Sequence, residues 1–228
     1  MNEPRTPAAL FDAVERDLKP VRPLASPERR ALALLPLAIA LLVGLPEFWN
    51  WRTHTALAPW PSWILSALET TLCLVILAAA FHEAVPGREL SRRTLTALVC
   101  AAGVGFVLIN TTTLSPAGIS HALWIQWFRE CIGTAITFSI PALIAPAWLV
   151  SRALPTRPAL TGALCGLGVG LMSDAGLRLF CWDGDYAHVL VAHGGAVLVL
   201  VALGSLSATI VERIKARRLK RMRLLRPT

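Results

Sequence analysis

The stretch ALTGALCGLGVGLMSDAGL, residues 159–177, decides the fold. It holds one charged residue, Asp174. As an α-helix it is about 28 Å long, close to the roughly 30 Å of a bilayer's hydrocarbon core. Gly162, Gly166 and Gly170 recur every four residues, a small-residue ridge that lets another helix approach closely. The stretch therefore predicts a tightly packed membrane helix, and we expect the glycine pair at 194–195 to receive its ridge.

Five further runs are similarly apolar. They are Ala31–Pro46, Trp63–Phe81, Thr94–Asn110, Ile132–Val150 and Val189–Ile210. Only 16% of the 228 residues are charged, against about 25% in ordinary soluble domains. A soluble helical bundle would need a polar stripe on each helix. We therefore predict an all-α polytopic membrane protein with six transmembrane helices in one bundle. Packing within this bundle explains the glycine ridge better than dimerisation, and the oligomeric state stays open.

The cationic residues predict the orientation in the membrane. Nineteen of the 22 Lys and Arg fall in the N-terminal segment, the second and fourth loops and the C-terminal tail, which share one side; only Arg52, Arg129 and Arg178 fall on the other. Cationic loops stay cytoplasmic, so both termini are expected in the cytoplasm of a bacterial cell, with the protein in the inner membrane. The polar first 30 residues show no cleaved signal peptide, so the first span is expected to remain as an anchor.

Three segments follow from this layout. Residues 1–30 form a cytoplasmic arm, residues 31–210 the six-helix domain, and residues 211–228 a basic tail. The tail, RIKARRLKRMRLLR at 213–226, is better explained by anionic lipid headgroups than by nucleic acid. We therefore expect membrane lipids as partners and no direct nucleic-acid binding.

Soft-ligand residues gather at the predicted outer face. Cys131 opens the fourth span, and Cys181 follows the fifth, just before His188 and His193. The two cysteines could form a disulfide, remain a redox-sensitive thiol pair, or bind a thiophilic metal with the histidines. The histidines are five apart, whereas four best aligns two ligands on an α-helix, so spacing alone supports a metal weakly. The other cysteines, Cys73, Cys100 and Cys165, read as small buried apolar residues.

Acidic residues also occupy the outer half of the predicted bundle. Glu69 and Asp174 lie within spans, and Glu130 lies at the same level. Charges in the membrane are costly and need a partner or a function. Arg129 and Arg178 are the expected counter-ions.

The N-terminal arm carries one apolar stripe. Leu10, Phe11, Val14 and Leu18 share a face of a short helix predicted between Thr6 and Pro20, and prolines follow it. Such a helix is typical of a peptide that docks in a groove; a helix lying on the membrane fits the pattern equally well.

In order, these motifs resemble a known family. Five stretches of the chain are similar to the NrsF-like bacterial membrane anti-sigma factors. They are LFDAVERDLKPVRPL (10–24), AVPGRELSRR (84–93), RECIG (129–133), RPALTGALCGLGVG (157–170) and CWDGDYAHVLVAHGGAVL (181–198). The resemblance implies that the segment from about Leu10 to Leu24, Val21 included, sequesters an extracytoplasmic-function sigma factor. It also implies that two outer cysteines, here Cys131 and Cys181, are needed for the response to heavy-metal or oxidative stress.

The sequence thus predicts a membrane anti-sigma factor that is not an enzyme, with no cofactor beyond a transient heavy-metal ion acting as signal. A transporter for a metal or small cation is the alternative, with Glu69 and Asp174 as its ligands, but no continuous polar pathway or inverted repeat is visible. A quinone-linked thiol oxidase would need a CxxC or a cofactor motif, and neither occurs.

Overall fold

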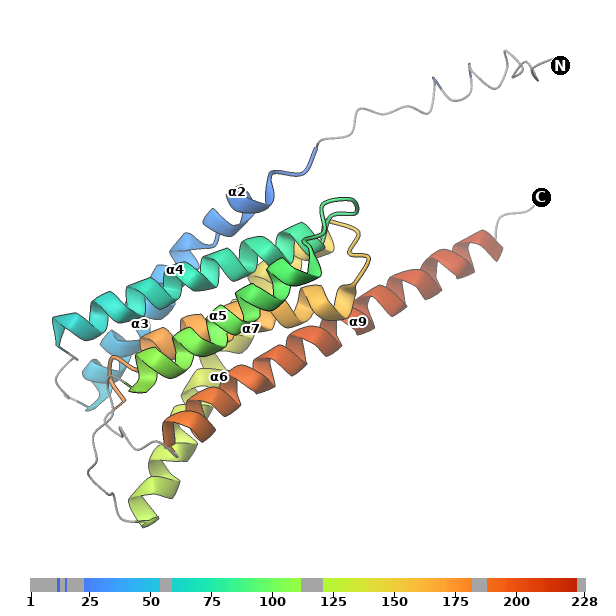
Figure 1. Ribbon diagram of the computed structural model, residues 1–228. Coiled ribbons are helices and arrows are strands. Elements are labelled where there is room, and N and C mark those ends of the chain that lie inside the picture. Colours follow the sequence, from blue (N-terminus) through green and yellow to red (C-terminus); the bar gives the residue numbers. More distant parts are fainter. Residues whose placement is uncertain are drawn as a thin grey trace.

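A computed structural model describes residues 12, 15, 23–53, 59–111, 121–181 and 188–224. Every element in these ranges is helical (Figure 1). The elements are α2 (Pro27–Leu32), α3 (Leu35–Thr53), α4 (Trp60–Glu83), α5 (Arg92–Thr111), α6 (His121–Ser151), α7 (Pro158–Leu177), η1 (Val189–His193) and α9 (Gly194–Leu224). Among the described residues, six stretches are long and apolar enough to cross a membrane, and all elements there are helices, which confirms the all-α prediction. The predicted basic tail continues α9 without a break to Leu224.

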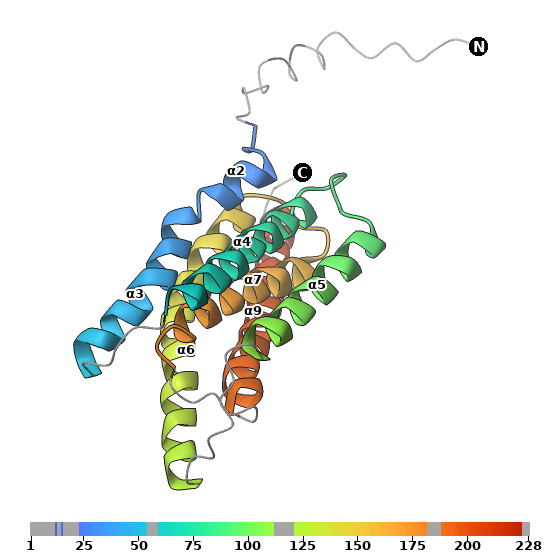
Figure 2. The same ribbon diagram turned by 60° about the vertical axis from the view of Figure 1, so that its left-hand side comes forward.

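Helix α7, the stretch quoted above, forms the centre of the bundle. It contacts α3, α4, α6 and α9, and Figure 2 shows it enclosed by its neighbours. Of its most apolar window 83% is buried, against 17% in α5, which lies at the periphery. A helix with no polar face and many small residues can be surrounded on all sides, because no side requires water.

The glycine ridge of α7 packs against α9, but at residues other than those predicted. A Cβ on Gly162 would collide with the carbonyl oxygen of Gly204, and a Cβ on Gly166 with that of Leu200. Nothing lies within 4 Å of a Cβ on Gly195, and Gly194 faces Phe106 instead. The expected pairing with 194–195 is therefore wrong. The two helices run antiparallel, so the N-terminal end of α7 meets the middle of α9 rather than its start.

The short helix α2 joins the N-terminal segment to the bundle. Ser26 caps it, its side-chain oxygen accepting a hydrogen bond from Arg29 N at 3.3 Å. The Arg30 side chain is buried; it donates to Leu149 O at the end of α6 and lies 4.5 Å from the centre of the Phe81 ring near the end of α4. His82 Nε2 also lies 2.8 Å from Glu28 Oε1. Helix α2 is thus held by the C-terminal ends of α4 and α6.

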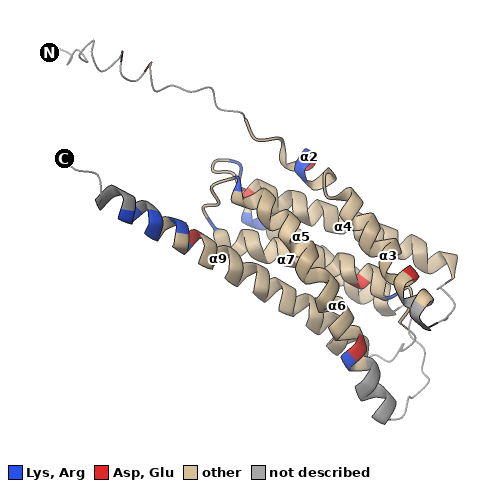
Figure 3. Cartoon of the chain, turned by 180° about the vertical axis from the view of Figure 1, so that it is seen from behind, with Lys and Arg blue, Asp and Glu red and all other residues tan. Residues whose placement is uncertain are grey.

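Lys and Arg residues gather at the end of the bundle where α2 begins and α9 ends (Figure 3). Arg88 lies between α4 and α5, Arg92 is the first residue of α5, and Arg152 and Arg157 lie between α6 and α7; all four are exposed. The middle of the bundle is largely free of charge in the described ranges, apart from a few buried groups near the opposite end. The two ends of the bundle therefore differ in their content of Lys and Arg, as the sequence predicts.

Candidate functional site

Two cysteines that are 50 residues apart meet at the end of the bundle opposite α2. Cys131 lies on α6, and Cys181 follows the C-terminal end of α7. Their sulfur atoms are 3.4 Å apart, too far for a disulfide bond of about 2.05 Å, so both are thiols. Cys131 is 4% exposed and Cys181 is half-buried. The two cysteines that the sequence analysis pairs thus lie in direct contact.

A π-helical turn brings both predicted histidines to the thiols. In an α-helix, residues five apart point about 140° away from each other. Here, Val189–His193 form the π-helix η1, in which Gly194 N–H donates to Val189 O five residues back. Residues five apart therefore lie on the same side of the helix, and the rings of His188 and His193 meet edge to face with their centres 5.5 Å apart. The five-residue spacing, which looked unfavourable for a shared site, is the spacing that a π turn needs.

Cys131, Cys181, His188 and His193 form one cluster of potential ligands. One ligand atom from each residue lies within 4.8 Å of those of the others. Cys181 Sγ is 3.4 Å from His188 Nε2, and both histidines are buried. The four ligands predicted from sequence thus meet in one place, and two thiols with two imidazoles suit soft or borderline metal ions.

The thiol of Cys181 is more acidic than an ordinary thiol. Its hydrogen bond with Cys131 lowers the pKa of Cys181 well below the ordinary thiol value, against the effect of burial. The positive charge of His193 and the hydrogen bond with His188 lower this pKa further. Because the thiolate is the nucleophile and the metal ligand, Cys181 is chemically activated.

A buried carboxylate supports the cluster from behind. His193 Nδ1 lies 2.7 Å from Asp174 Oδ1, and both side chains are at most 2% exposed. The second oxygen, Asp174 Oδ2, accepts a hydrogen bond from Asn110 Nδ2 at 3.2 Å. Asp174 therefore orients the imidazole of His193, as carboxylates do behind metal-binding histidines. Sequence reasoning missed Asn110, which lies 64 residues away from Asp174.

The second buried acid, Glu69, pairs with Arg178, as predicted. Their side chains, 2% and 4% exposed, form an ion pair through Glu69 Oε2 and Arg178 Nη2. Arg178 lies three residues before Cys181, so the pair ties α4 to the end of α7 beside the thiols. The other expected counter-ion, Arg129, is exposed and lies with Glu130 in a separate groove. Asp174 uses His193 and Asn110 instead, because these side chains reach it inside the bundle.

The remaining sequence predictions have mixed outcomes. Cys73 and Cys165 are buried as expected. Cys100 is exposed on the side of α5 that faces away from the bundle, so the prediction that it is buried is wrong. The reason is that α5 is peripheral, and most of its residues face away from the bundle. The arm residues, Leu10, Phe11, Val14, Leu18 and Val21, lie outside the described residues.

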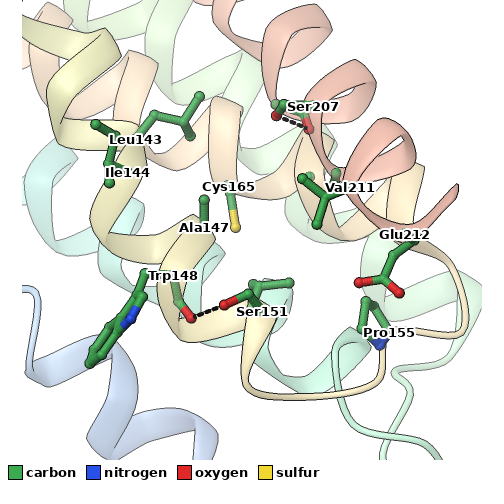
Figure 4. A pocket seen from close by; sticks show the side chains of 14 residues that line it. Leu143, Ile144, Ala147, Trp148, Ser151, Pro155, Cys165, Ser207, Val211 and Glu212 are labelled. Atoms are coloured by element: carbon green, nitrogen blue, oxygen red, sulfur yellow. Dashed lines mark hydrogen bonds between the residues drawn. The ribbon is translucent and has the colours of Figure 1, made fainter. Parts of the chain in front are cut away.

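A cavity of about 300 Å³ lies near the other end of the bundle, between α6, α7 and α9 (Figure 4). Its wall is mostly apolar and includes Cys165 and Val211. The hydroxyls of Ser151 and Ser207 donate to carbonyl oxygens of their own helices, at 2.7 and 3.0 Å. The cavity therefore presents few polar groups to a ligand, and the candidate site remains the cluster of thiols and imidazoles.

Comparison with known proteins identifies a matching family. The NrsF family model, described as negative regulator of sigma F, matches residues 15–213, which is most of the chain. No curated protein and no solved structure matches the chain. The matched range includes the described helices up to Arg213 and all four potential ligands.

Proposed function

The chain belongs to the NrsF family of negative regulators of sigma F, and on this premise we propose that it is a membrane-bound anti-sigma factor with an outer thiol sensor. Its N-terminal segment holds an extracytoplasmic-function sigma factor until the thiol pair reacts with a thiophilic metal or an oxidant. The observation that carries the proposal is the Cys131–Cys181 pair, 3.4 Å apart, at the far end of the bundle from the helix that follows the arm.

Membrane insertion is supported by the length and charge of the helices. Six helices are long and apolar enough to cross a bilayer, and many exposed side chains on them are large and apolar. Lys and Arg gather at one end (Figure 3), which the positive-inside rule assigns to the cytoplasm. We therefore propose the bacterial inner membrane, both termini in the cytoplasm, and the thiols on the outer face.

The sigma factor is proposed to bind the arm. In the sequence, Leu10, Phe11, Val14 and Leu18 recur at helical spacing, which is the pattern of an amphipathic helix that docks in an apolar groove. The segment ends a few residues before α2, so a sigma factor held there would stay close to the membrane and away from RNA polymerase.

Helices α4 and α6 provide a route between the two ends. Helix α6 carries Cys131, and its Leu149 O accepts from Arg30 on α2; the two positions are about 27 Å apart along a helix. Helix α4 carries Glu69, the partner of Arg178, and its other end contacts α2 through Phe81 and His82. Both helices thus touch the sensor at one end and α2 at the other, so a shift at the thiols can reach the arm. A tenfold change in sigma-factor affinity needs only about 1.4 kcal/mol.

The transporter alternative has less support. Its expected ligands, Glu69 and Asp174, are engaged by Arg178 and by His193 and Asn110. Buried acids that are held in this way favour a structural and positioning role over transient binding of a transported ion.

The proposal is tested by co-purification and induction in the host. The wild-type protein is expected to co-purify with a sigma factor. The double variant that combines Phe11→Asp with Val14→Asp is expected to lose the sigma factor. Cys131→Ser and Cys181→Ser should keep the sigma factor bound but abolish its release by cadmium or an oxidant, whereas Cys100→Ser, an exposed cysteine on α5, should behave as wild type. Normal release in both serine variants would refute the sensor, and retention of the sigma factor by the Asp variant would refute the role of the arm.

A further inference from the structure

The geometry of the cluster points to a specific occupant. We propose that Cys131, Cys181, His188 and His193 form a four-coordinate site for a soft or borderline divalent cation of the Zn²⁺ or Cd²⁺ type, with Asp174 as the residue that positions His193. The signalling role of this site rests on the proposed function, but the binding of the cation does not.

The spacing of the ligand atoms is close to that of a tetrahedron. With metal–sulfur bonds of about 2.3 Å and metal–nitrogen bonds of about 2.05 Å, tetrahedral sites have edges of about 3.8 Å between sulfurs and about 3.6 Å between sulfur and nitrogen. The Cys131–Cys181 and Cys181–His188 distances are both 3.4 Å, and all four ligand atoms lie within 4.8 Å of one another. Small side-chain movements therefore suffice to coordinate an ion.

The buried histidine is oriented for a ligand. His193 Nδ1 faces Asp174 Oδ1, and because a carboxylate accepts, the proton resides on Nδ1. In the neutral imidazole, which is the form that binds a metal, Nε2 of His193 is the lone-pair nitrogen; it is buried and has no hydrogen-bond partner among the described residues. Since the side chain is only 2% exposed, water satisfies this nitrogen poorly, whereas a metal ion would satisfy it. Carboxylate–histidine–metal chains have this arrangement.

The π-helical turn η1 adds an independent observation. It is the only π-helical element in the described ranges, and it places His188 and His193 on one face beside Cys181. π turns cost stability relative to regular helix and occur often at functional sites. Binding would convert the cation and two thiols into a neutral dithiolate complex and release two protons to the solvent, with no change in oxidation state.

The test is metal titration of the full-length protein, purified in detergent with reductant. Wild type is expected to bind one Cd²⁺ or Co²⁺ per chain with a thiolate-to-metal charge-transfer band, and with Co²⁺ to show the intense visible absorption of a tetrahedral site. Cys181→Ala should abolish the band, and Asp174→Asn should weaken affinity by about 10–100-fold. Cys100→Ser is the matched control and should bind as wild type. Gel filtration and thermal melts of each variant separate lost ligation from lost folding.

Some outcomes would overturn the site. Absence of a stoichiometric charge-transfer band in folded wild type would refute it, as would undiminished affinity in both His193→Ala and Asp174→Asn. Such a result would leave the proposed anti-sigma function standing if Cys131→Ser and Cys181→Ser still block release in cells, since oxidation of the thiols would then be the signal. Conversely, tight metal binding with no co-purified sigma factor would refute the function and keep the site.

Discussion

At the residue scale, the two cysteines differ in exposure, and Cys181 has an unusually acidic thiol. Cys131 is buried on α6, whereas Cys181 is half-buried and has a lowered pKa. An electrophile or a metal ion from outside therefore meets the Cys181 thiolate first, and Cys131 would react second from 3.4 Å away. This order assigns attack to Cys181 and closure of the pair to Cys131.

The lowered pKa predicts the pH dependence of alkylation at Cys181. Because the folded-state pKa is below that of an ordinary thiol, the thiolate persists as the pH falls and is lost only below the lowered pKa. The alkylation rate of folded protein should therefore stay high at a pH where an ordinary thiol, of pKa about 8.5, is mostly protonated. Mass spectrometry of protein treated with iodoacetamide between pH 5 and about 9 measures the alkylation rate of Cys181. His193→Gln should move the profile to higher pH, and a profile like that of a short cysteine peptide would contradict the assignment.

The Glu69–Arg178 pair predicts a strongly non-additive double mutant. Both side chains are almost fully buried, so Arg178→Gln leaves an unpaired buried carboxylate and should cost about 3–5 kcal/mol. Glu69→Gln should cost a similar amount, but the double variant should recover most of the loss, because no lone charge remains. Thermal melts in detergent provide the measurement, and additive losses would show that the two groups act independently.

At the element scale, α7 and α9 are fixed by backbone contact. Gly162 and Gly204 face each other, and Gly166 faces the backbone of Leu200, with no room for a side chain. The repeat in the sequence identified the ridge and the correct partner helix. It missed the register, because antiparallel pairing depends on where the loop between the helices ends, and the pattern at 194–195 carries no information about that.

The close contact predicts opposite effects for two Gly→Ala changes. Gly166→Ala places a Cβ against Leu200 O, and pushing the helices apart should cost about 1–3 kcal/mol. Gly195→Ala meets open space and should be neutral or stabilising by up to about 1 kcal/mol, because alanine favours the helix. Unfolding followed by circular dichroism in detergent distinguishes them. Equal melting temperatures for the two variants would contradict the register described here.

At the scale of the whole molecule, the bundle separates its chemistry from its basic end. The thiols, the imidazoles and the buried acids Glu69 and Asp174 lie at one end, whereas α2, held by Arg30 and His82, lies at the other. Helix α7 occupies the centre between them. Because its neighbours pack directly against it, α4 and α6 have little freedom to move independently of each other.

The contacts of α2 predict a variant that separates binding from signalling. Arg30→Ala removes the donor to Leu149 O and the contact with Phe81, whereas Arg29→Ala changes an exposed neighbour on the same helix. If α2 receives the signal, Arg30→Ala should still retain the sigma factor but lose most of its release by cadmium, and Arg29→Ala should behave as wild type. A reporter for the sigma factor measures both. Full induction in Arg30→Ala would exclude this route.

The sequence was sufficient for the six helices and for the four residues that meet in the thiol–imidazole cluster, because long apolar runs and clustered Cys and His leave direct signals. It was insufficient for the partners of Asp174. Asn110 is distant in the chain, and an arginine looked like the natural counter-ion, yet only folding shows which side chains reach a buried carboxylate. The π turn was also hidden, because one extra residue in an apolar run changes no composition or periodicity.

That extra residue has an evolutionary corollary. Removing one of the residues 189–192 would convert the π turn to regular α-helix and place the two imidazoles four positions apart, still on a common side. The residues after Gly194 would keep the same orientation toward α7. Adding a residue there would instead turn His188 away. Deletions at this point should thus be tolerated in natural variation far more readily than insertions, which makes length polymorphism between Cys181 and Gly194 a signature of the site.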